Sequence, residues 1–216
     1  MAPFFLTPPM TSIPSTVSTT ELDALNKVLG AVGQAPVTTI EETNPDVAIV
    51  WATLQDCNRE VQAEGWNFNR ETQYPLTASA TGILSVPSES LFIDLSDVPA
   101  NRGIDVTVRQ GKLYNLVDHT FTWQANEVYL VDVVWQLDFN DLPIPAREYI
   151  ISRASVQASY KVVGDQALYQ MLQQKEAYSR TNLMTYETEQ GDHSMFGWKL
   201  GQNLYEAYRP FIVLTR

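Results

Sequence analysis

The hydrophobic residues of this chain change their spacing twice, and this change constrains the fold more than any other feature. Up to residue 65 they recur every three or four positions, as on one face of a helix. From 66 to 144 many alternate with polar residues, as in half-buried strands, and from 145 to 190 the helical spacing returns. Because helical stretches enclose the strand stretch, we predict an α+β fold. It is an antiparallel helical bundle of four main helices (19–65 and 145–190) with an inserted small antiparallel β domain (66–144).

The first helical stretch contains two helices with recognisable ends. Ser18 followed by Glu21 has capping-box spacing, and Gly33 is suited to ending the first helix. Asn44 followed by Pro45 predicts the start of the second helix. The apolar stripes of the two helices comprise Leu22, Leu25, Val28, Leu29 and Val32, then Val47, Ile49, Val50, Trp51, Leu54 and Val61. The second stripe is wide, so we expect that helix to be buried on more than one side.

The stretch from 66 to 144 contains the signals of five to seven short strands. Trp66 and Phe68 alternate with asparagines, and Gln110-Gly111 lies between two β-rich runs as a hairpin turn. The other predicted strands cover 83–87, 90–95, 105–116 and 127–137. We expect these strands to form a sheet or a small sandwich.

The second helical stretch again contains two helices. Pro145 is a typical first-turn residue, Gly164 ends the third helix and Asp165 caps the fourth. Small residues on the third helix let a neighbouring helix pack closely: Ala154, Ser155, Ala158 and Ser159. The apolar face of the fourth helix is predicted to comprise Leu168, Met171, Leu172, Ala177 and Tyr178.

Two segments are predicted to extend from this fold. Residues 1–18 contain four prolines and no charged residue, and they lack the basic start and long apolar run of a signal peptide. We expect an extended N-terminal arm, either free or lying along a neighbour. Residues 191–216 hold five aromatic residues among glycines. We expect this aromatic docking tail to pack on its own bundle or on a partner chain.

The charge balance excludes one large class of function. Fourteen Lys and Arg stand against 25 Asp and Glu, a net charge of −11, whereas proteins built to grip phosphate carry a basic excess. The acidity lies in the first helical pair and the strand stretch. Only 18% of the residues are charged, against about 25% in an average soluble domain. This shortage indicates that part of the surface faces other subunits.

No motif of established catalytic or cofactor chemistry is present. The sequence lacks glycine-rich phosphate loops, H-E-x-x-H and G-x-S-x-G. His119 and His193 have no metal-ligand spacing, and nothing near Cys57 would stabilise a thiolate. The single cysteine excludes an intrachain disulfide. The sequence contains no run of 18 apolar residues, so it predicts no membrane span. We therefore predict no catalytic, cofactor-binding or metal-binding residues.

Paired carboxylates keep one enzymatic alternative open, a peptidoglycan or polysaccharide hydrolase that uses two acidic side chains. The neighbouring acids are Glu41 with Glu42, Asp94 with Asp97, and Asp138 with Asp141. Each pair fits a loop or a helix cap better than a catalytic site, so the alternative ranks second.

The tip of the predicted hairpin is locally basic. Arg109 and Lys112 flank the turn, and Arg102 lies a few residues earlier. Three cations in an acidic segment make a poor DNA clamp.

Several motifs occur in the order and spacing of a known family. The first helix ends in G-x-x-P-V, formed by Gly33, Pro36 and Val37, and the second leads into G-W-x-F-N at 65–69. The run LPIPAREYIISRASVQASYKVVGD follows, and the chain ends in L-T-R. In these features residues 20–216 resemble the tail tubular proteins A of short-tailed podophages. The proline-rich N-terminal arm departs from the family's pattern.

The resemblance implies a structural virion protein with defined partners. The family forms a dodecameric adaptor ring between the portal and the hexameric nozzle, which is tail tubular protein B, and tail fibres attach at that junction. DNA passes through the lumen without specific binding, and assembly takes place in the host cytoplasm. Some members are credited with hydrolysis of cell-wall or capsular polymers, but no motif here allows catalytic residues to be carried over.

Two sets of contact residues follow from this resemblance. We expect the aromatic docking tail to anchor on the portal and the β segment to lie on the nozzle and fibre side. The portal-interface candidates are Trp198, Tyr205, Tyr208, Arg209 and Phe211. The nozzle and fibre candidates are Arg102, Arg109 and Lys112.

Overall fold

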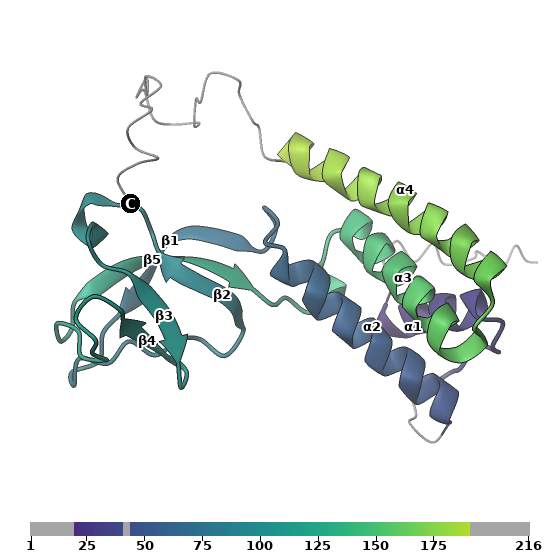
Figure 1. The fold of residues 1–216 in the computed structure, drawn as a ribbon, viewed down its shortest axis with the longest axis horizontal. Coiled ribbons are helices and arrows are strands. Elements are labelled where there is room, and N and C mark those ends of the chain that lie inside the picture. Colours follow the sequence, from purple (N-terminus) through teal and green to yellow (C-terminus); the bar gives the residue numbers. More distant parts are fainter. Residues whose placement is uncertain (1–19, 41–43, 191–216) are drawn as a thin grey trace, which may run out of the picture.

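The computed structural model describes residues 20–40 and 44–190 (Figure 1). The helices are α1 (Glu21–Ala31), α2 (Pro45–Ala63), α3 (Ile144–Ala158) and α4 (Gln166–Gln190), with two short 3₁₀ helices, η1 (Pro99–Asn101) and η2 (Phe139–Asp141), and a π-helix, η3 (Ser159–Val163). The strands are β1 (Arg70–Thr77), β2 (Ser90–Leu95), β3 (Val106–Arg109), β4 (Lys112–Asn115) and β5 (Val128–Trp135). This order confirms the predicted α+β fold with four main helices and small antiparallel sheets. Both predicted extensions lie outside the described residues.

The first two helices start at side-chain caps. At α1 the cap is Thr20, whose hydroxyl accepts from the Asp23 amide at 3.2 Å while the Asp23 carboxylate accepts from the Thr20 amide at 3.2 Å. The predicted box of Ser18 and Glu21 is therefore wrong, because the same three-residue spacing recurs two positions later and the helix starts at Thr20. At α2 the Asn44 side chain accepts from the Asp46 amide at 3.0 Å, which confirms the predicted cap.

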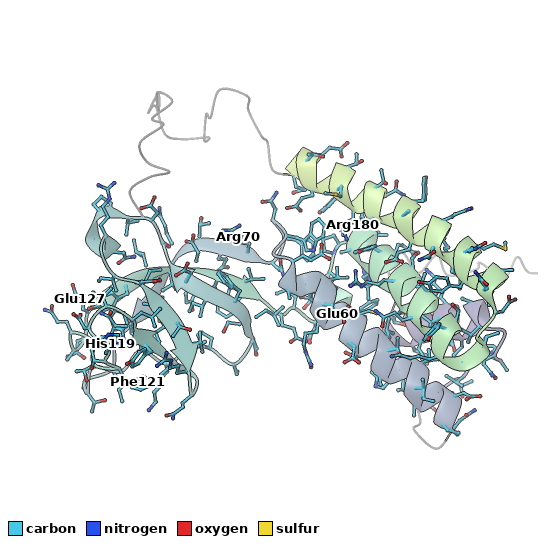
Figure 2. All side chains as sticks on the ribbon, viewed as in Figure 1. Glu60, Arg70, His119, Phe121, Glu127 and Arg180 are labelled. Atoms are coloured by element: carbon cyan, nitrogen blue, oxygen red, sulfur yellow. The ribbon has the colours of Figure 1, made fainter. Side chains whose placement is uncertain are left out.

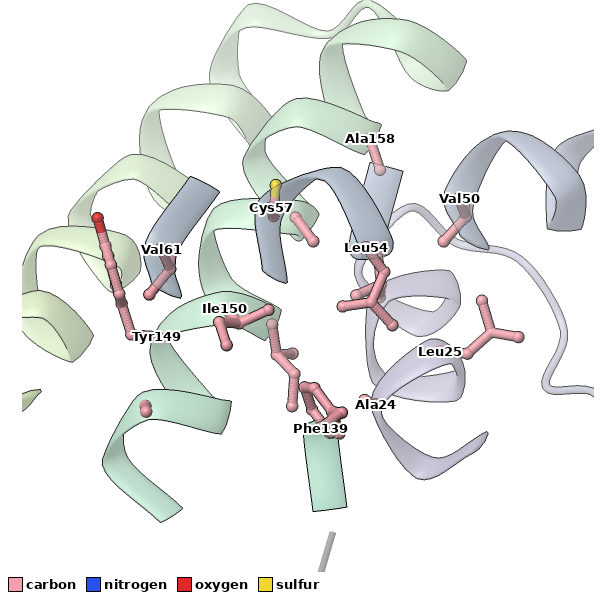
Figure 3. Packing of buried hydrophobic residues seen from close by; sticks show 14 of the residues in the cluster. Ala24, Leu25, Val50, Leu54, Cys57, Val61, Phe139, Tyr149, Ile150 and Ala158 are labelled. Carbon is pink, nitrogen blue, oxygen red and sulfur yellow. The ribbon is translucent and has the colours of Figure 1, made fainter. Parts of the chain in front are cut away.

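Helix α3 lies at the centre of the bundle, because it packs against α1, α2 and α4. Figure 3 shows side chains of α1, α2 and α3 meeting in one cluster, to which Leu25, Leu54 and Ile150 contribute buried side chains. The cluster also takes in Trp66 and Phe139, which the sequence places in the strand stretch. Residues from both sides of the β insertion therefore complete the helical core.

Helix α2 is buried on a narrower face than predicted. Val50 is fully buried, whereas its neighbour Ile49 is 42% exposed. The expectation that this helix is buried on more than one side is wrong at Ile49. The residue faces outward because α1 and α3 are the helices against which α2 packs.

Helix α4 packs on α3 along a narrow line. Ser179 and Leu183 are its buried residues, and the Ser179 hydroxyl shares a 2.9 Å hydrogen bond with Ser152 of α3. The predicted burial of Met171 and Tyr178 is wrong, since their side chains are 70% and 69% exposed. Of the remaining predicted positions, Leu168 and Leu172 are partly buried and Ala177 is exposed.

The connection between α3 and α4 follows the predicted residues. Gly164 adopts a φ of 71°, and the Asp165 carboxylate accepts from the Ala167 amide at 2.9 Å at the start of α4. The small α3 residues that were expected to allow close packing are all buried: Ala154, Ser155, Ala158 and Ser159. The π-helix η3 at the end of α3 has no counterpart in the sequence prediction.

Two antiparallel sheets make up the β region, one with strand order β1-β5-β2 and the other formed by β3 and β4. The β3–β4 turn is at Gln110-Gly111, where φ is 54° and 68°. Positive φ at both turn residues is the geometry that suits a two-residue hairpin, so the predicted turn is confirmed. The five strands agree with the expected five to seven.

Two of the predicted strands are wrong. Residues 66–69 form a turn, in which the Trp66 amide donates to Asn69 Oδ1 at 2.9 Å, and β1 begins only at Arg70. The asparagine side chain supplies a local partner that competes with a strand ladder. Residues 83–87 make only a single bridge, between Ser85 and Lys112.

Candidate interaction surfaces

The helical and β parts are joined by a buried polar junction. Gln62, at the end of α2, is fully buried. Its amide nitrogen donates to Asn58 Oδ1 at 2.9 Å and to the Leu137 carbonyl at 3.0 Å, and its Oε1 accepts from the Leu137 amide at 2.7 Å. Asn69 donates to the Gln62 carbonyl at 2.9 Å and to the Trp135 carbonyl at 2.8 Å. These directional hydrogen bonds fix the orientation of the β region relative to the helical bundle.

The far end of α4 also reaches this junction. The Asn67 amide donates to Glu187 Oε1 at 2.6 Å, and the Asn67 side chain donates to the Glu187 carbonyl at 3.3 Å. The last turn of α4 is therefore held against the loop between α2 and β1.

A charged network links α2, α3 and α4. The Tyr149 hydroxyl of α3 accepts from Arg153 at 3.2 Å and from Arg180 of α4 at 2.8 Å. Arg153 also pairs with Glu60 at 2.9 Å, and Arg180 pairs with Glu64 at 3.3 Å. Figure 2 shows Glu60 and Arg180 on α2 and α4, on either side of α3. Hydrogen bonding to Tyr149 raises the pKa of Arg180, so its guanidinium stays charged within this network.

The structure brings together two of the three basic candidates. Arg109 and Lys112 face each other across the β3–β4 turn. The Arg109 guanidinium lies 4.2 Å from the centre of the Tyr114 ring, and that ring packs edge-on against Phe121 at 4.8 Å. Arg102 is exposed but follows η1, so it lies before the start of β3 while Arg109 lies at its end. The hairpin tip thus carries two of these cations, and Arg109 lies over an aromatic ring.

The portal-interface candidates lie outside the described residues. Trp198, Tyr205, Tyr208, Arg209 and Phe211 all belong to residues 191–216, and so does His193. Glu41 and Glu42 also fall outside.

Cys57 has the environment of a structural thiol. It is fully buried between helices, and this burial raises its pKa to about 12. At neutral pH the side chain therefore stays protonated, and the thiolate that would act as a nucleophile is not formed.

The described residues offer no assembled metal site, since no group of three or more His, Cys, Asp or Glu side chains lies together among them. Asp138 precedes the 3₁₀ helix η2 and Asp141 is its last residue, and the Asp141 backbone amide donates to the Asp138 backbone carbonyl at 2.9 Å. Asp94 accepts from the Leu95 amide at 2.8 Å. Of the helices within 20–40 and 44–190, none is long and apolar enough to cross a membrane.

The sequence analysis did not predict the exposed apolar side chains of the helical bundle and of the β region. Phe92 on β2 is 53% exposed and Val128 on β5 is 52% exposed, in addition to Met171 and Tyr178 on α4. A signal for Phe92 exists in its strand, because Phe92 alternates with Leu91 and Ile93 and shares its side of the strand with Asp94. Large exposed apolar side chains in groups are typical of surfaces that another protein covers.

These features define a subunit whose described surfaces are suited to protein contacts and whose buried polar groups have structural roles. Comparison with known proteins agrees with this class. The family model for tail tubular protein matches residues 22–193. The chain therefore belongs to the tail tubular protein family and is a structural component of the phage tail, hence of the virion. A similar protein is tail tubular protein A of Klebsiella phage KP34, which is 28% identical over 149 residues, covering 69% of this chain and 76% of that protein.

Proposed function

We propose that this protein is the subunit of an adaptor ring that joins the portal to the nozzle of a phage tail. The tail tubular family match over 22–193 carries this proposal. The related Klebsiella phage protein bears the name tail tubular protein A, the type of protein that this sequence resembles. In the proposed assembly twelve copies surround the DNA channel, nozzle protein B and tail fibres attach on one side, and the ring is built in the host cytoplasm.

The charge distribution supports a conduit for DNA. The chain carries a net charge of −11, concentrated in its first helical pair and β region. Acidic groups facing a lumen repel DNA phosphates, so the genome slides without being held. Low charge content suits the remaining surfaces, each of which is covered by a neighbouring subunit or partner.

The two hydrophobic clusters support a division into two units. One cluster lies among the helices, and the other lies between the sheets around Leu84, Leu113, Val131 and Val133. We propose that 19–65 with 145–190 forms the ring body and that 66–144 reaches towards the nozzle. The N-terminal arm 1–18 and the aromatic docking tail 191–216 then act as contacts to neighbours.

Removal of the aromatic docking tail tests the portal contact. A variant lacking 192–216 is expected to lose portal binding, because Trp198, Tyr205 and Phe211 are the kind of side chains that dominate interface energies. Portal binding is measured by co-sedimentation, and circular dichroism checks that the helices are retained. A variant with residues 192–216 in scrambled order serves as the matched control and should also fail to bind. Undiminished binding by the truncated chain contradicts the assignment.

Charge reversal at the hairpin tip tests the nozzle contact. Arg109→Glu combined with Lys112→Glu is expected to weaken binding to the nozzle protein by about tenfold, because interface charges act mainly on association. Binding is followed by surface plasmon resonance at two salt concentrations. Arg102→Glu reverses a charge before β3 and leaves the tip intact, so it should have the smaller effect. Nozzle binding that is unchanged by the double variant argues against this side of the proposal.

A further inference from the structure

One face of the three-stranded sheet is open in part, with Phe92 on β2 53% exposed and Val128 on β5 52% exposed, while the other face packs on the second hydrophobic cluster. Strand register places Phe92 beside Val134, and Asp94 beside Asp132, on the same face. Leu130 follows Asp132 on that face, because alternate residues of β5 point the same way. Ile93, Val131 and Val133 point to the opposite face and are buried. Val134, beside Phe92, is buried, so the open part of this face presents Phe92, the acidic pair and the partly buried Leu130 in sequence.

Helix α4 presents a stripe of matching character. Met171, Lys175 and Tyr178 are spaced four and three residues apart, which puts them on one side of the helix. Met171 is 70% exposed and Tyr178 is 69% exposed, and Lys175 between them is also exposed. The α4 stripe, Met171–Lys175–Tyr178, is thus a cation between two large apolar side chains.

The two surfaces correspond in spacing. From Tyr178 to Met171 the helix rises about 10 Å, at about 1.5 Å per residue. From Phe92, level with Val134, to Leu130 the strand rises about 13 Å, at about 3.3 Å per residue. The two lengths differ by about 3 Å, so a helix lying between β2 and β5 brings Tyr178 over Phe92 and Met171 near Leu130.

The charges of the two surfaces are complementary in the same alignment. Lys175, at the middle of the α4 stripe, falls over Asp132, at the middle of the sheet face. The Asp132 carboxylate accepts from the Ser96 hydroxyl and the Gln73 amide, which are both neutral donors. Asp94 lies directly opposite Asp132 on the next strand and adds a second negative charge. An ammonium group at this position would be attracted by both carboxylates.

Within one chain these surfaces do not meet, because α4 packs chiefly on α3 and η3. We propose that the α4 stripe of one copy docks on the open sheet face of a second copy. The contact joins two different surfaces, so each copy can bind a neighbour on both sides, and repetition generates a ring when the rotation closes. The inference rests on the proposed ring and specifies which surfaces of the subunits form it.

Site-specific cross-linking tests this contact. Phe92→Cys and Tyr178→Cys variants with different affinity tags are co-expressed as full chains and treated with a short bismaleimide, since a packed helix and sheet lie about 10 Å apart. Cys57 contributes no background, because its thiol is fully buried and protonated. The expected result is a cross-linked dimer carrying both tags, a product that cannot form within one chain.

The matched control moves the cysteine around the helix. Met184→Cys is also on an exposed side chain of α4, but lies six residues from Tyr178 and about 120° around the helix. Replacing Tyr178→Cys by Met184→Cys should abolish the doubly tagged dimer. Equal cross-linking by both variants, or none from the Tyr178→Cys pair, overturns the inference.

Mass photometry of the same samples separates this inference from the proposed function. Oligomers with the Phe92–Tyr178 cross-link support both. Oligomers without that cross-link overturn the proposed contact and leave the ring standing. Monomers throughout, with and without portal, overturn the ring and the contact together.

Discussion

Gln62→Leu should lower the free energy of unfolding by about 3–5 kcal/mol, because it leaves buried polar groups without partners. The leucine has a similar volume but cannot hydrogen-bond. The Asn58 oxygen and both backbone groups of Leu137 then lose bonds of 2.9, 3.0 and 2.7 Å. The midpoint of urea unfolding, followed by circular dichroism, measures the loss.

Gln55→Leu is the matched control for this prediction. Gln55 lies on the same helix, is partly exposed and makes none of the junction bonds. The same chemical change there should alter stability by about 0.5 kcal/mol or less. If the two variants unfold at the same urea concentration, the junction does not have the structural role described above.

Gly82→Ala should be nearly as damaging, with an expected loss of about 2–4 kcal/mol. Gly82 adopts a φ of 73°, and an added Cβ would lie 2.4 Å from the Trp123 carbonyl oxygen. That oxygen belongs to the backbone and cannot swing away, because the Trp123 amide donates to the Gly82 carbonyl at 2.7 Å. Relief of the clash requires breaking this pairing at the edge of the second hydrophobic cluster.

Gly103→Ala separates the clash from the cost of the backbone conformation. Gly103 has a φ of 85°, and its Cβ position is open, with nothing within 4 Å. This variant should lose only about 1–2 kcal/mol, the cost of alanine in the left-handed region. Thermal unfolding of the two variants side by side gives the difference. Equal unfolding midpoints would show that the Trp123 backbone shifts to accommodate the new Cβ and that the clash with its carbonyl oxygen does not affect stability.

Elements with strong local signals could be predicted from the sequence. The proline and asparagine at the start of α2, the glycine after α3 and the Gln110-Gly111 turn each impose a backbone geometry that few other residues favour. The predicted start of α1 lies two residues too early, because Ser18 with Glu21 and Thr20 with Asp23 have the same spacing. Sequence spacing alone does not distinguish them, and the hydrogen bonds do.

The orientation of α4 could not be predicted, and the reason is physical. A helix that packs chiefly on one neighbour has a narrow buried line, so apolar residues can lie on either side of it. Met171 and Tyr178 are as hydrophobic as core residues, yet α3 reaches Ser179 and Leu183 instead. The same ambiguity affected Ile49, whose position beside the buried Val50 carries no information about which of them faces α3.

The residues of the candidate surfaces could be predicted only in part from the sequence. The hairpin turn correctly paired Arg109 with Lys112, because a two-residue turn fixes its flanking residues. Arg102 could not be placed, since η1 before it and the loop that leads from it to β3 have no strong sequence signal. Asp132 and Asp94 become neighbours only through strand register, which depends on pairing between distant segments.

Single-particle electron microscopy of the full chain, alone and mixed with portal protein, tests the central claim most directly. The account predicts closed rings that stack coaxially on the portal, with an open lumen wide enough for duplex DNA. Dispersed monomers in both samples, or particles that never associate with the portal, would contradict the adaptor assignment.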